Sequence, residues 1–209
     1  MRIRFLLHEG SFPERSFAGV HPTLANSHGL TPLPSTTVTR MNTTIFNIIG
    51  VYVGWFACVV GAAQGLPWIG PAVVLLLLVG HCRLVPHVAQ ELRLLFTVGA
   101  LGFALDTLLA ALGLFSFSGS SGVAWISPPW MVALWMNFAT TLHTSLSWLS
   151  GRYLLAALLG AAGGPLSYYA GAQLGALILH ANVTLSILTV AAAWGGAAPL
   201  LVWLANDRK

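Results

Sequence analysis

Six apolar stretches fill the chain from residue 45 almost to its C-terminus. A helix rises about 1.5 Å per residue, so roughly 20 apolar residues cross the ~30 Å hydrocarbon layer of a membrane. We place the predicted spans at residues 45–63, 67–84, 92–115, 130–149, 153–179 and 183–205. The sequence therefore predicts an all-α fold, a polytopic transmembrane bundle of about six helices.

The composition excludes an ordinary soluble domain. Charged residues make up 7% of the chain and hydrophobic residues 56%, with a mean hydropathy of +0.80. Soluble domains carry about 25% charged residues. The net charge of +4 rests on few basic residues, so we expect the lipid bilayer as the main partner and no nucleic acid.

The basic residues near the span ends predict an orientation. Arg83 and Arg93 lie at the junction of the second and third spans, and Arg152 lies between the fourth and fifth. Arg208 and Lys209 follow the sixth span. Because Lys and Arg are enriched in cytoplasmic loops, we expect this side, and with it both termini, in the cytoplasm.

Residues 1–40 differ from the rest of the chain. They hold four Arg, two Glu, three His and four Pro, without a sustained hydrophobic period. We interpret residues 1–40 as a disordered leader or as the result of a mis-called translation start, with Met41 as the true beginning. Residues 41–209 form the predicted six-span transmembrane domain.

The fourth predicted span carries a polar stripe. At about 100° per residue, Asn137, Thr140, Thr141 and Thr144 share one arc of the helix, opposite an apolar face. In lipid, a polar helix face turns toward protein or toward a cavity. Hydroxyl groups on such a face either hydrogen-bond neighbouring helices or line a cavity, and the sequence leaves both readings open.

Asp106 is the only acidic residue that we expect to be buried within a span. Its depth along the third span matches that of Asn137 and Thr141, so we expect it to contact them. An acid at membrane depth is a candidate for binding a proton or a substrate; a hydrogen-bonded structural acid is the alternative. Asp106 and the polar stripe together predict an intramembrane polar cavity.

Four further positions are predicted to be weaker cavity candidates or helix-packing positions. His143 lies beside the stripe, and Gln173 lies near the end of the fifth span; both are weaker candidates for the cavity. Gly164 permits close helix packing, and Pro165 removes a backbone donor, so we expect a kink and a tight contact in the fifth span.

We expect no metal, cofactor or disulfide. His81 and His87 are six residues apart, which does not place them on one helix face. Cys58 and Cys82 have no CxxC partner. The chain also lacks the nucleotide-binding and hydrolase motifs that mark catalytic residues, so no catalytic residue is assigned.

Four runs of the sequence resemble a known family. They are "GWFACVVGAAQGLPWIGP" (54–71), "ELRLLFTVGALGFALDTLLAALG" (91–113), "WMVALWMNFATTLHTSLSWL" (130–149) and "LLGAAGGPLSYYAGAQLGAL" (158–177). From Met41 to the C-terminus the chain resembles small proteobacterial inner-membrane proteins that carry only a domain-of-unknown-function label. The resemblance implies a multi-pass protein of the bacterial inner membrane with no established activity. The chain departs from the expected family pattern at His143, where Asn is expected, and at Gln173, where a basic residue is expected.

Three functions are compatible with these features. The first is a small carrier or lipid-handling protein whose polar cavity takes a membrane lipid or a small polar solute. The resemblance favours lipid, because it implies neighbouring genes of the cyclopropane-fatty-acid-synthase type. The second is a non-catalytic partner subunit that assembles with other membrane subunits through glycine-rich helix faces. The third, and least supported, is a membrane-embedded lipid-modifying enzyme with Asp106 and His143 as acid and base.

Overall fold

The computed structural model describes residues 35–118, 125–180 and 182–207, with side chains from residue 43 onward. The expected leader, residues 1–40, thus lies mostly outside the described residues, and the first helix begins before the expected start at Met41. In chain order the elements are α1 (Ser35–Ala63), α2 (Ile69–Leu84), α3 (Val88–Ala111), β1 (Phe115–Phe117), α4 (Pro129–Ala139), the 3₁₀-helix η1 (Ser147–Leu149), α5 (Tyr153–Gln173), β2 (Leu177–Leu179) and α6 (Val183–Asn206).

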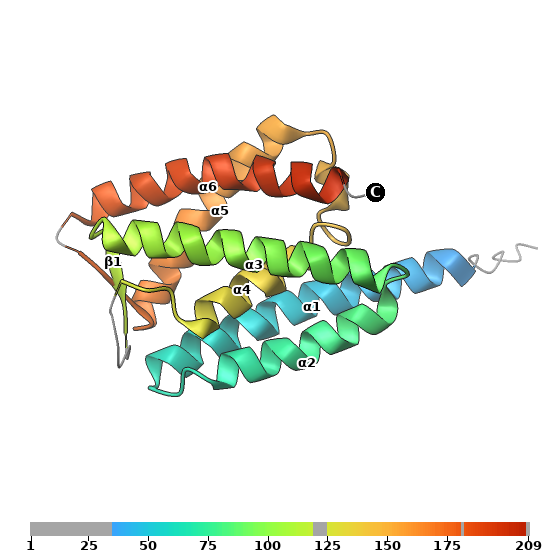
Figure 1. The fold of residues 1–209 in the computed structure, drawn as a ribbon, viewed down its shortest axis with the longest axis horizontal. Coiled ribbons are helices and arrows are strands. Elements are labelled where there is room, and N and C mark those ends of the chain that lie inside the picture. The colour runs from blue at the N-terminus through green and yellow to red at the C-terminus, as the bar shows by residue number, and fades with distance from the viewer. Residues whose placement is uncertain (1–34, 119–124, 181, 208–209) are drawn as a thin grey trace, which may run out of the picture. The chain divides into compact units, whose positions relative to one another are not determined.

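The predicted all-α fold is confirmed. The described residues form six α-helices with two short strands (Figure 1). Within this part of the chain, three helices are long and apolar enough to cross a membrane: Thr43–Ala63 inside α1, all of α3 and all of α6. α2 is a shorter apolar helix. The chain therefore has the helices of a membrane protein, while six crossings and cytoplasmic termini remain predictions.

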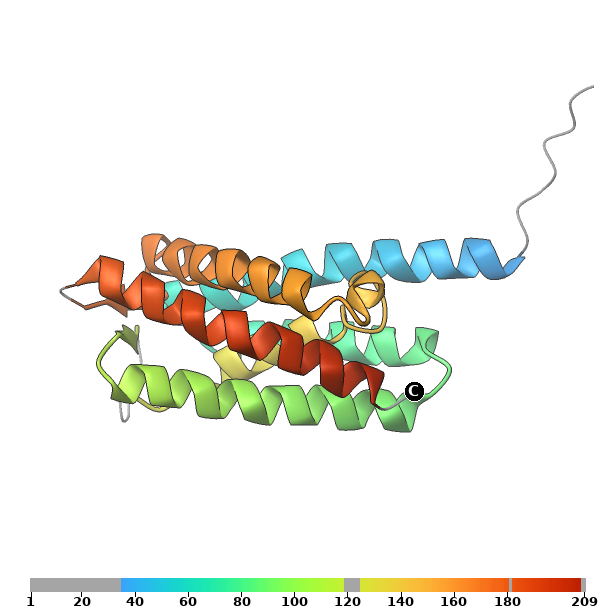
Figure 2. The same ribbon diagram turned by 90° about the horizontal axis from the view of Figure 1, so that it is seen from above.

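The helices pack in two groups. α4 contacts α1, α2 and α3, and α5 packs along α6. The two views show α5 and α6 as neighbours, with α4 lying between α1 and α3 in Figure 1 (Figures 1 and 2). A further contact between α3 and α6 joins the groups. α4 is accordingly the central helix and buries Trp130, Ala133, Trp135 and Asn137.

Glycines allow the closest helix contacts. A Cβ atom at Gly102 of α3 would lie 2.0 Å from Cγ of Trp135, and one at Gly164 of α5 would lie 2.2 Å from Cγ of Trp194. Because these distances are far below van der Waals contact, a larger side chain would force the helices apart. The two indole rings stack with centroids 4.5 Å apart and an interplanar angle of 11°. Indole rings of the same chain therefore fill the glycine faces of α3 and α5.

α3 and α5 end in the same way, and both end earlier than predicted. Gly113 and Gly175 follow them with φ angles of +73° and +90°, a conformation that glycine adopts without strain. In each case the residue after the glycine donates its N–H to a carbonyl five residues back, as in a Schellman motif. The chain then continues into β1 and β2, which pair antiparallel with Phe115 opposite Leu179. The predicted spans 92–115 and 153–179 are therefore wrong at their C-terminal ends.

The fourth predicted span is wrong as a continuous helix. α4 ends at Ala139, and residues 140–146 form turns before η1 begins. A helix of 11 residues rises roughly 16 Å, about half of the hydrocarbon layer. The cause is local, because Ser and Thr hydroxyls compete with backbone amides for carbonyl oxygens and this segment is rich in both.

Candidate functional site

A cavity of about 570 Å³ lies between the two helix groups. Its walls come from α1, α4, the segment that follows α4, α5, β2 and α6, and most of the lining is hydrocarbon or aromatic. The large aromatic side chains in the wall include Tyr52, Trp55, Trp130, Trp135, Tyr168 and Trp194. The volume falls within the range of about 300–1,000 Å³ that is usual for small-ligand sites. We call this space the apolar cavity.

The apolar cavity opens at the outer surface between α1 and α5. Tyr52 of α1 and Leu159 of α5 both line it, yet they are 64% and 45% exposed. Trp55 Nε1 of α1 donates a hydrogen bond to Ser167 Oγ of α5 over 2.9 Å. Exposed neighbours on the same helices, such as Phe56, are apolar as well. The opening is therefore set in a surface that suits hydrocarbon.

Asp106 lies behind the wall of the apolar cavity. Its side chain is fully buried, and Trp135 Nε1 donates to Oδ2 over 2.7 Å. The Tyr168 hydroxyl donates to Oδ1. The expected contact of Asp106 with Asn137 and Thr141 is wrong, because Trp135 and Tyr168 occupy both carboxyl oxygens. Both donors line the cavity, so Asp106 holds two wall residues in place from outside it.

Asn137 is the member of the predicted polar set that the structure places in the cavity wall. Its Nδ2 donates to Val51 O of α1 over 3.0 Å. The side chain lies over Gly54, where a Cβ atom would come within 2.3 Å of Nδ2. Asn137 thus ties α4 to α1 and adds an amide to a mainly apolar wall.

The threonines of the stripe bond to their own segment. Thr140, Thr141 and Thr144 each donate to a backbone carbonyl three or four residues earlier, over 2.6–2.7 Å. These carbonyls lie where α4 stops and the regular helical ladder of amide donors ends, although the Thr141 amide still donates to the Phe138 carbonyl. The hydroxyls therefore satisfy the backbone of the broken helix, and the described cavity lining does not include them.

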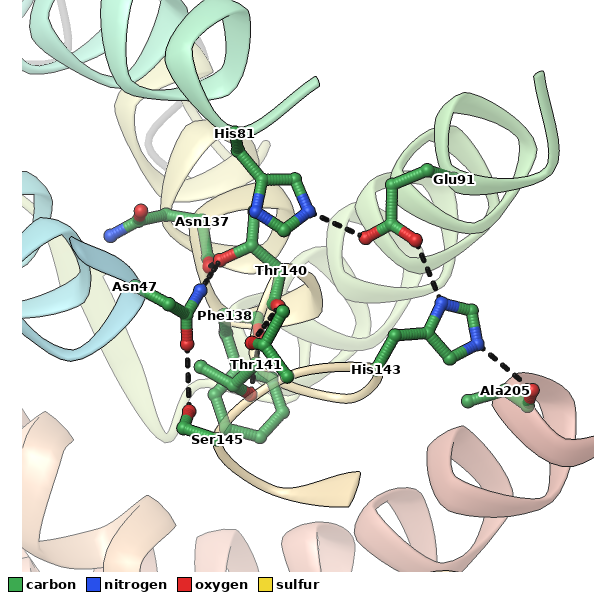
Figure 3. A network of polar contacts seen from close by, with 11 residues as sticks. Asn47, His81, Glu91, Asn137, Phe138, Thr140, Thr141, His143, Ser145 and Ala205 are labelled. Carbon is green, nitrogen blue, oxygen red and sulfur yellow. Dashed lines mark hydrogen bonds and ion pairs between the residues drawn. The ribbon is translucent and has the colours of Figure 1, made fainter. Parts of the chain in front are cut away.

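Asn47 of α1 completes this network, which Figure 3 shows. Its Nδ2 donates to Thr140 Oγ1, and its Oδ1 accepts from Ser145 Oγ, both over 2.7 Å. One amide therefore holds two points of the unwound segment. Sequence reasoning missed Asn47, because a polar residue near the start of a span resembles an ordinary interfacial residue.

A second network surrounds Glu91, in the first turn of α3 (Figure 3). Glu91 Oε1 lies 2.8 Å from His81 Nε2, and Oε2 lies 2.7 Å from His143 Nδ1. His143 Nε2 lies 3.0 Å from the Ala205 carbonyl oxygen of α6. Glu91 and His81 are 3% and 2% exposed. The expectation that Asp106 is the only acidic residue buried within a span is wrong, because α3 also contains the buried Glu91.

Sequence reasoning missed Glu91 for a physical reason. It immediately precedes the predicted span 92–115, where a charged residue normally faces the membrane–water interface. α3 begins at Val88, and this start turns Glu91 inward. Neither histidine is close to it in sequence, so spacing alone does not reveal the cluster.

The remaining predicted positions lie apart from these two networks. Pro165 stands inside α5, which is one helix from Tyr153 to Gln173. Gln173, its last residue, lines a hollow beside β2 together with Ser118 and Tyr169. Among the predicted positions in α5, Gly164 reaches the apolar cavity.

Comparison with known proteins gives a family and no activity. A family model described as "Protein of unknown function (DUF2878)" matches residues 44–200. No curated protein and no solved structure matches the chain. The matched segment contains all of α2, α3, α4 and α5, and so most of the cavity wall. The expectation of a family with only a domain-of-unknown-function label is confirmed: this chain belongs to the family of proteins of unknown function DUF2878.

Proposed function

We propose that this protein binds an apolar chain of the kind carried by membrane lipids, in the cavity between α1, α4, α5 and α6. One observation carries the proposal: a cavity with a mainly hydrocarbon and aromatic wall opens between two helices whose outer surfaces are also apolar. A lipid tail can pass from a bilayer into such a cavity without crossing water. The hydrophobic effect then opposes a polar occupant far more than an apolar one.

The wall supplies a few polar groups that can orient the ligand. Ser167 and Tyr168 already have partners in Trp55 and Asp106. Within the described residues, Oδ1 of Asn137 accepts no hydrogen bond, so it is available to a donor group on the ligand. Sites for apolar ligands commonly combine a hydrophobic wall with a small number of such groups.

The alternatives have less support from the contacts. An enzyme that pairs Asp106 with His143 as acid and base is disfavoured, because Asp106 bonds to Trp135 and Tyr168 while His143 bonds to Glu91. A partner subunit needs free small-residue faces, and indole rings of this chain already cover those of α3 and α5. A small polar solute does not match the wall. Lipid handling therefore ranks first.

Photo-crosslinking tests the proposal. We would place the full chain in lipid nanodiscs that contain a phospholipid with a diazirine near the end of its acyl chain, and map adducts by peptide mass spectrometry. Met131 and Leu142 line the cavity and are only 5% and 6% exposed, so lipid outside the protein does not reach them. We expect adducts at these positions. Adducts confined to outward residues such as Leu154 would contradict the proposal.

A matched pair of variants makes the test specific. Gly163 lines the cavity, and a Cβ atom there meets no atom within 4 Å. In Gly163→Phe the ring should occupy the cavity and abolish the Met131 and Leu142 adducts. Gly196 of α6 has the same open surroundings but is outside the cavity lining. Gly196→Phe should therefore leave those adducts unchanged.

A further inference from the structure

The hydrogen bonds of His143 determine where its protons lie (Figure 3). Nε2 faces the Ala205 carbonyl oxygen over 3.0 Å. A carbonyl oxygen only accepts hydrogen bonds, so Nε2 carries a hydrogen. A neutral imidazole carries one hydrogen, which would leave Nδ1 as a bare acceptor. Yet Nδ1 lies 2.7 Å from Glu91 Oε2.

A bare Nδ1 and an ionised carboxylate oxygen cannot share a hydrogen bond, because both only accept. One more hydrogen must therefore lie between Nδ1 of His143 and Oε2 of Glu91. It resides on the ring, as an imidazolium beside a carboxylate, or on the carboxyl group, beside a neutral ring. Both arrangements hold the same number of protons.

His81 is compatible with either arrangement. Its Nε2 lies 2.8 Å from Glu91 Oε1 and donates to it. Its Nδ1 is buried and has no hydrogen-bond partner within the described residues. A hydrogen on Nδ1 would make a buried and unpaired charged donor, which is costly. His81 is therefore neutral, with a bare Nδ1.

The geometry points to a proton-binding site formed by His81, Glu91 and His143. With its proton, the cluster has no net charge. Without it, the cluster would hold one negative charge on a carboxylate that is 3% exposed, and burial of an uncompensated charge is strongly unfavourable. The ligand of the site is a proton. The inference does not depend on lipid binding in the apolar cavity.

Among the described residues, no buried Lys or Arg accompanies the cluster. The Cys82 thiol of α2 lies within electrostatic range of Glu91, and α6 contributes the Ala205 carbonyl. Arg83 of α2, Arg93 of α3 and Asp207 after α6 are exposed. The buried Asp106 of α3 lies about 22 Å further along that helix. The side chain of His143 keeps 19% of its surface accessible, so the proton can exchange with water through this ring.

The site joins parts of the chain that are distant in sequence. Glu91 is on α3, His81 on α2, His143 in the unwound segment after α4, and Ala205 near the end of α6. Loss of the proton would set a bare ring nitrogen against a carboxylate and break the link between α3 and His143. Proton occupancy therefore stabilises this end of the bundle.

Magnetic resonance on the intact protein tests the site. We would label histidine and glutamate with ¹⁵N and ¹³C in nanodiscs and record spectra at about pH 8, where a free imidazole, which titrates near 6.5, is mostly neutral. We expect either both nitrogens of His143 protonated or a protonated Glu91 carboxyl group. A bare His143 Nδ1 together with an ionised Glu91 at this pH would overturn the proposal.

Two variants assign the signal, and a third serves as a control. In Glu91→Gln the amide can donate to Nδ1 and accept from His81, so the bonds survive without the extra proton. A proton titration of the folded protein should then show that, at about pH 8, the variant binds one proton fewer per chain than the wild type. His143→Asn removes the ring and should leave the buried Glu91 carboxyl group to hold the proton. His87 is exposed, and His87→Asn should keep it.

If a variant does not fold, the magnetic resonance spectrum of the wild type still tests the proton-binding site. An unchanged proton count in a folded Glu91→Gln protein would also refute the site, because no other described group at Glu91 can account for the hydrogen.

Discussion

Asp106 and Trp135 form the contact on which the cavity wall depends: the indole N–H donates to Oδ2 over 2.7 Å, and the same ring covers Gly102 on the helix that carries the acid. The ring also stacks on Trp194 of α6. One side chain of α4 thereby bonds to α3, packs on α3 and contacts α6. Tyr168 of α5 reaches the other carboxyl oxygen, so Asp106 anchors residues from two helices of the wall.

Replacement of Asp106 should destabilise the protein in proportion to the number of hydrogen-bond donors that lose their acceptor. In Asp106→Asn, the amide oxygen can accept from Trp135 and the amide nitrogen can donate to Tyr168, so a small loss is expected. Asp106→Leu leaves two buried donors without an acceptor, at about 1–3 kcal/mol each. Unfolding in detergent should rank wild type above Asn and Asn above Leu. The exposed Asp207, changed to Asn, should match wild type; equal stability of the Asn and Leu variants would contradict this role.

The threonines after α4 should matter more than ordinary helix hydroxyls. Replacement of Thr140, Thr141 and Thr144 by Val removes three donors from carbonyls at a helix end. At roughly 0.5–1.5 kcal/mol per hydrogen bond, the free energy of unfolding should fall by about 2–4 kcal/mol. Thr189 also donates to a carbonyl, that of Leu185, but within the continuous helix α6.

Thr189→Val is the matched control for the triple variant. The Leu185 carbonyl keeps its backbone donor there, so the change should cost less than a third of the triple effect. A triple variant as stable as wild type would show that the hydroxyls do not support the unwound segment.

The contact between α5 and α6 should be sensitive to a single methyl group. A Cβ atom at Gly160 would lie 2.4 Å from the Trp194 backbone oxygen and 2.6 Å from Cβ of Ala198. The backbone cannot move aside as a flexible side chain could, so Gly160→Ala should destabilise the protein by about 1–3 kcal/mol. Gly163→Ala, three residues away and in open space, should be neutral or stabilising. Thermal unfolding of both variants tests this, and a loss of equal size in both would refute it.

Cysteines at two nearby positions of the chain should differ in their reactivity toward a lipid-soluble thiol reagent, because only one of them lines the apolar cavity. Phe138 lines the apolar cavity, whereas Thr141 is 5% exposed and is outside the described lining. In a background with Cys58 and Cys82 changed to Ala, a cysteine at position 138 should react with a lipid-soluble thiol reagent. A cysteine at position 141 should react at least tenfold more slowly. Gly163→Phe should slow the reaction at position 138, and no effect of that change would contradict the assigned cavity.

The sequence by itself determined the class of fold and the location of the helices. Apolar runs of span length can satisfy their backbone only as helices in a membrane, and this requirement is local to each run. Gly113 and Gly175 carried a usable signal for the helix ends, since glycine favours the left-handed conformation that follows a helix. The predicted spans were placed by length without using these glycines, so their C-terminal ends overlapped β1 and β2.

Only the tertiary structure decided which polar groups meet. Helical periodicity assigned Asn137 and the threonines to one face, but it assumed that the helix continues, and α4 stops at Ala139. Depth along the helices suggested that Asp106 contacts Asn137, but its carboxyl oxygens accept hydrogen bonds from Trp135 and Tyr168 instead. Gly102 lets the indole ring of Trp135 approach α3 closely. Glu91 bonds to His81 on α2, 10 residues earlier in the chain, and to His143 after α4, 52 residues later. Such pairings depend on how remote helices pack, and no pattern along one segment contains that information.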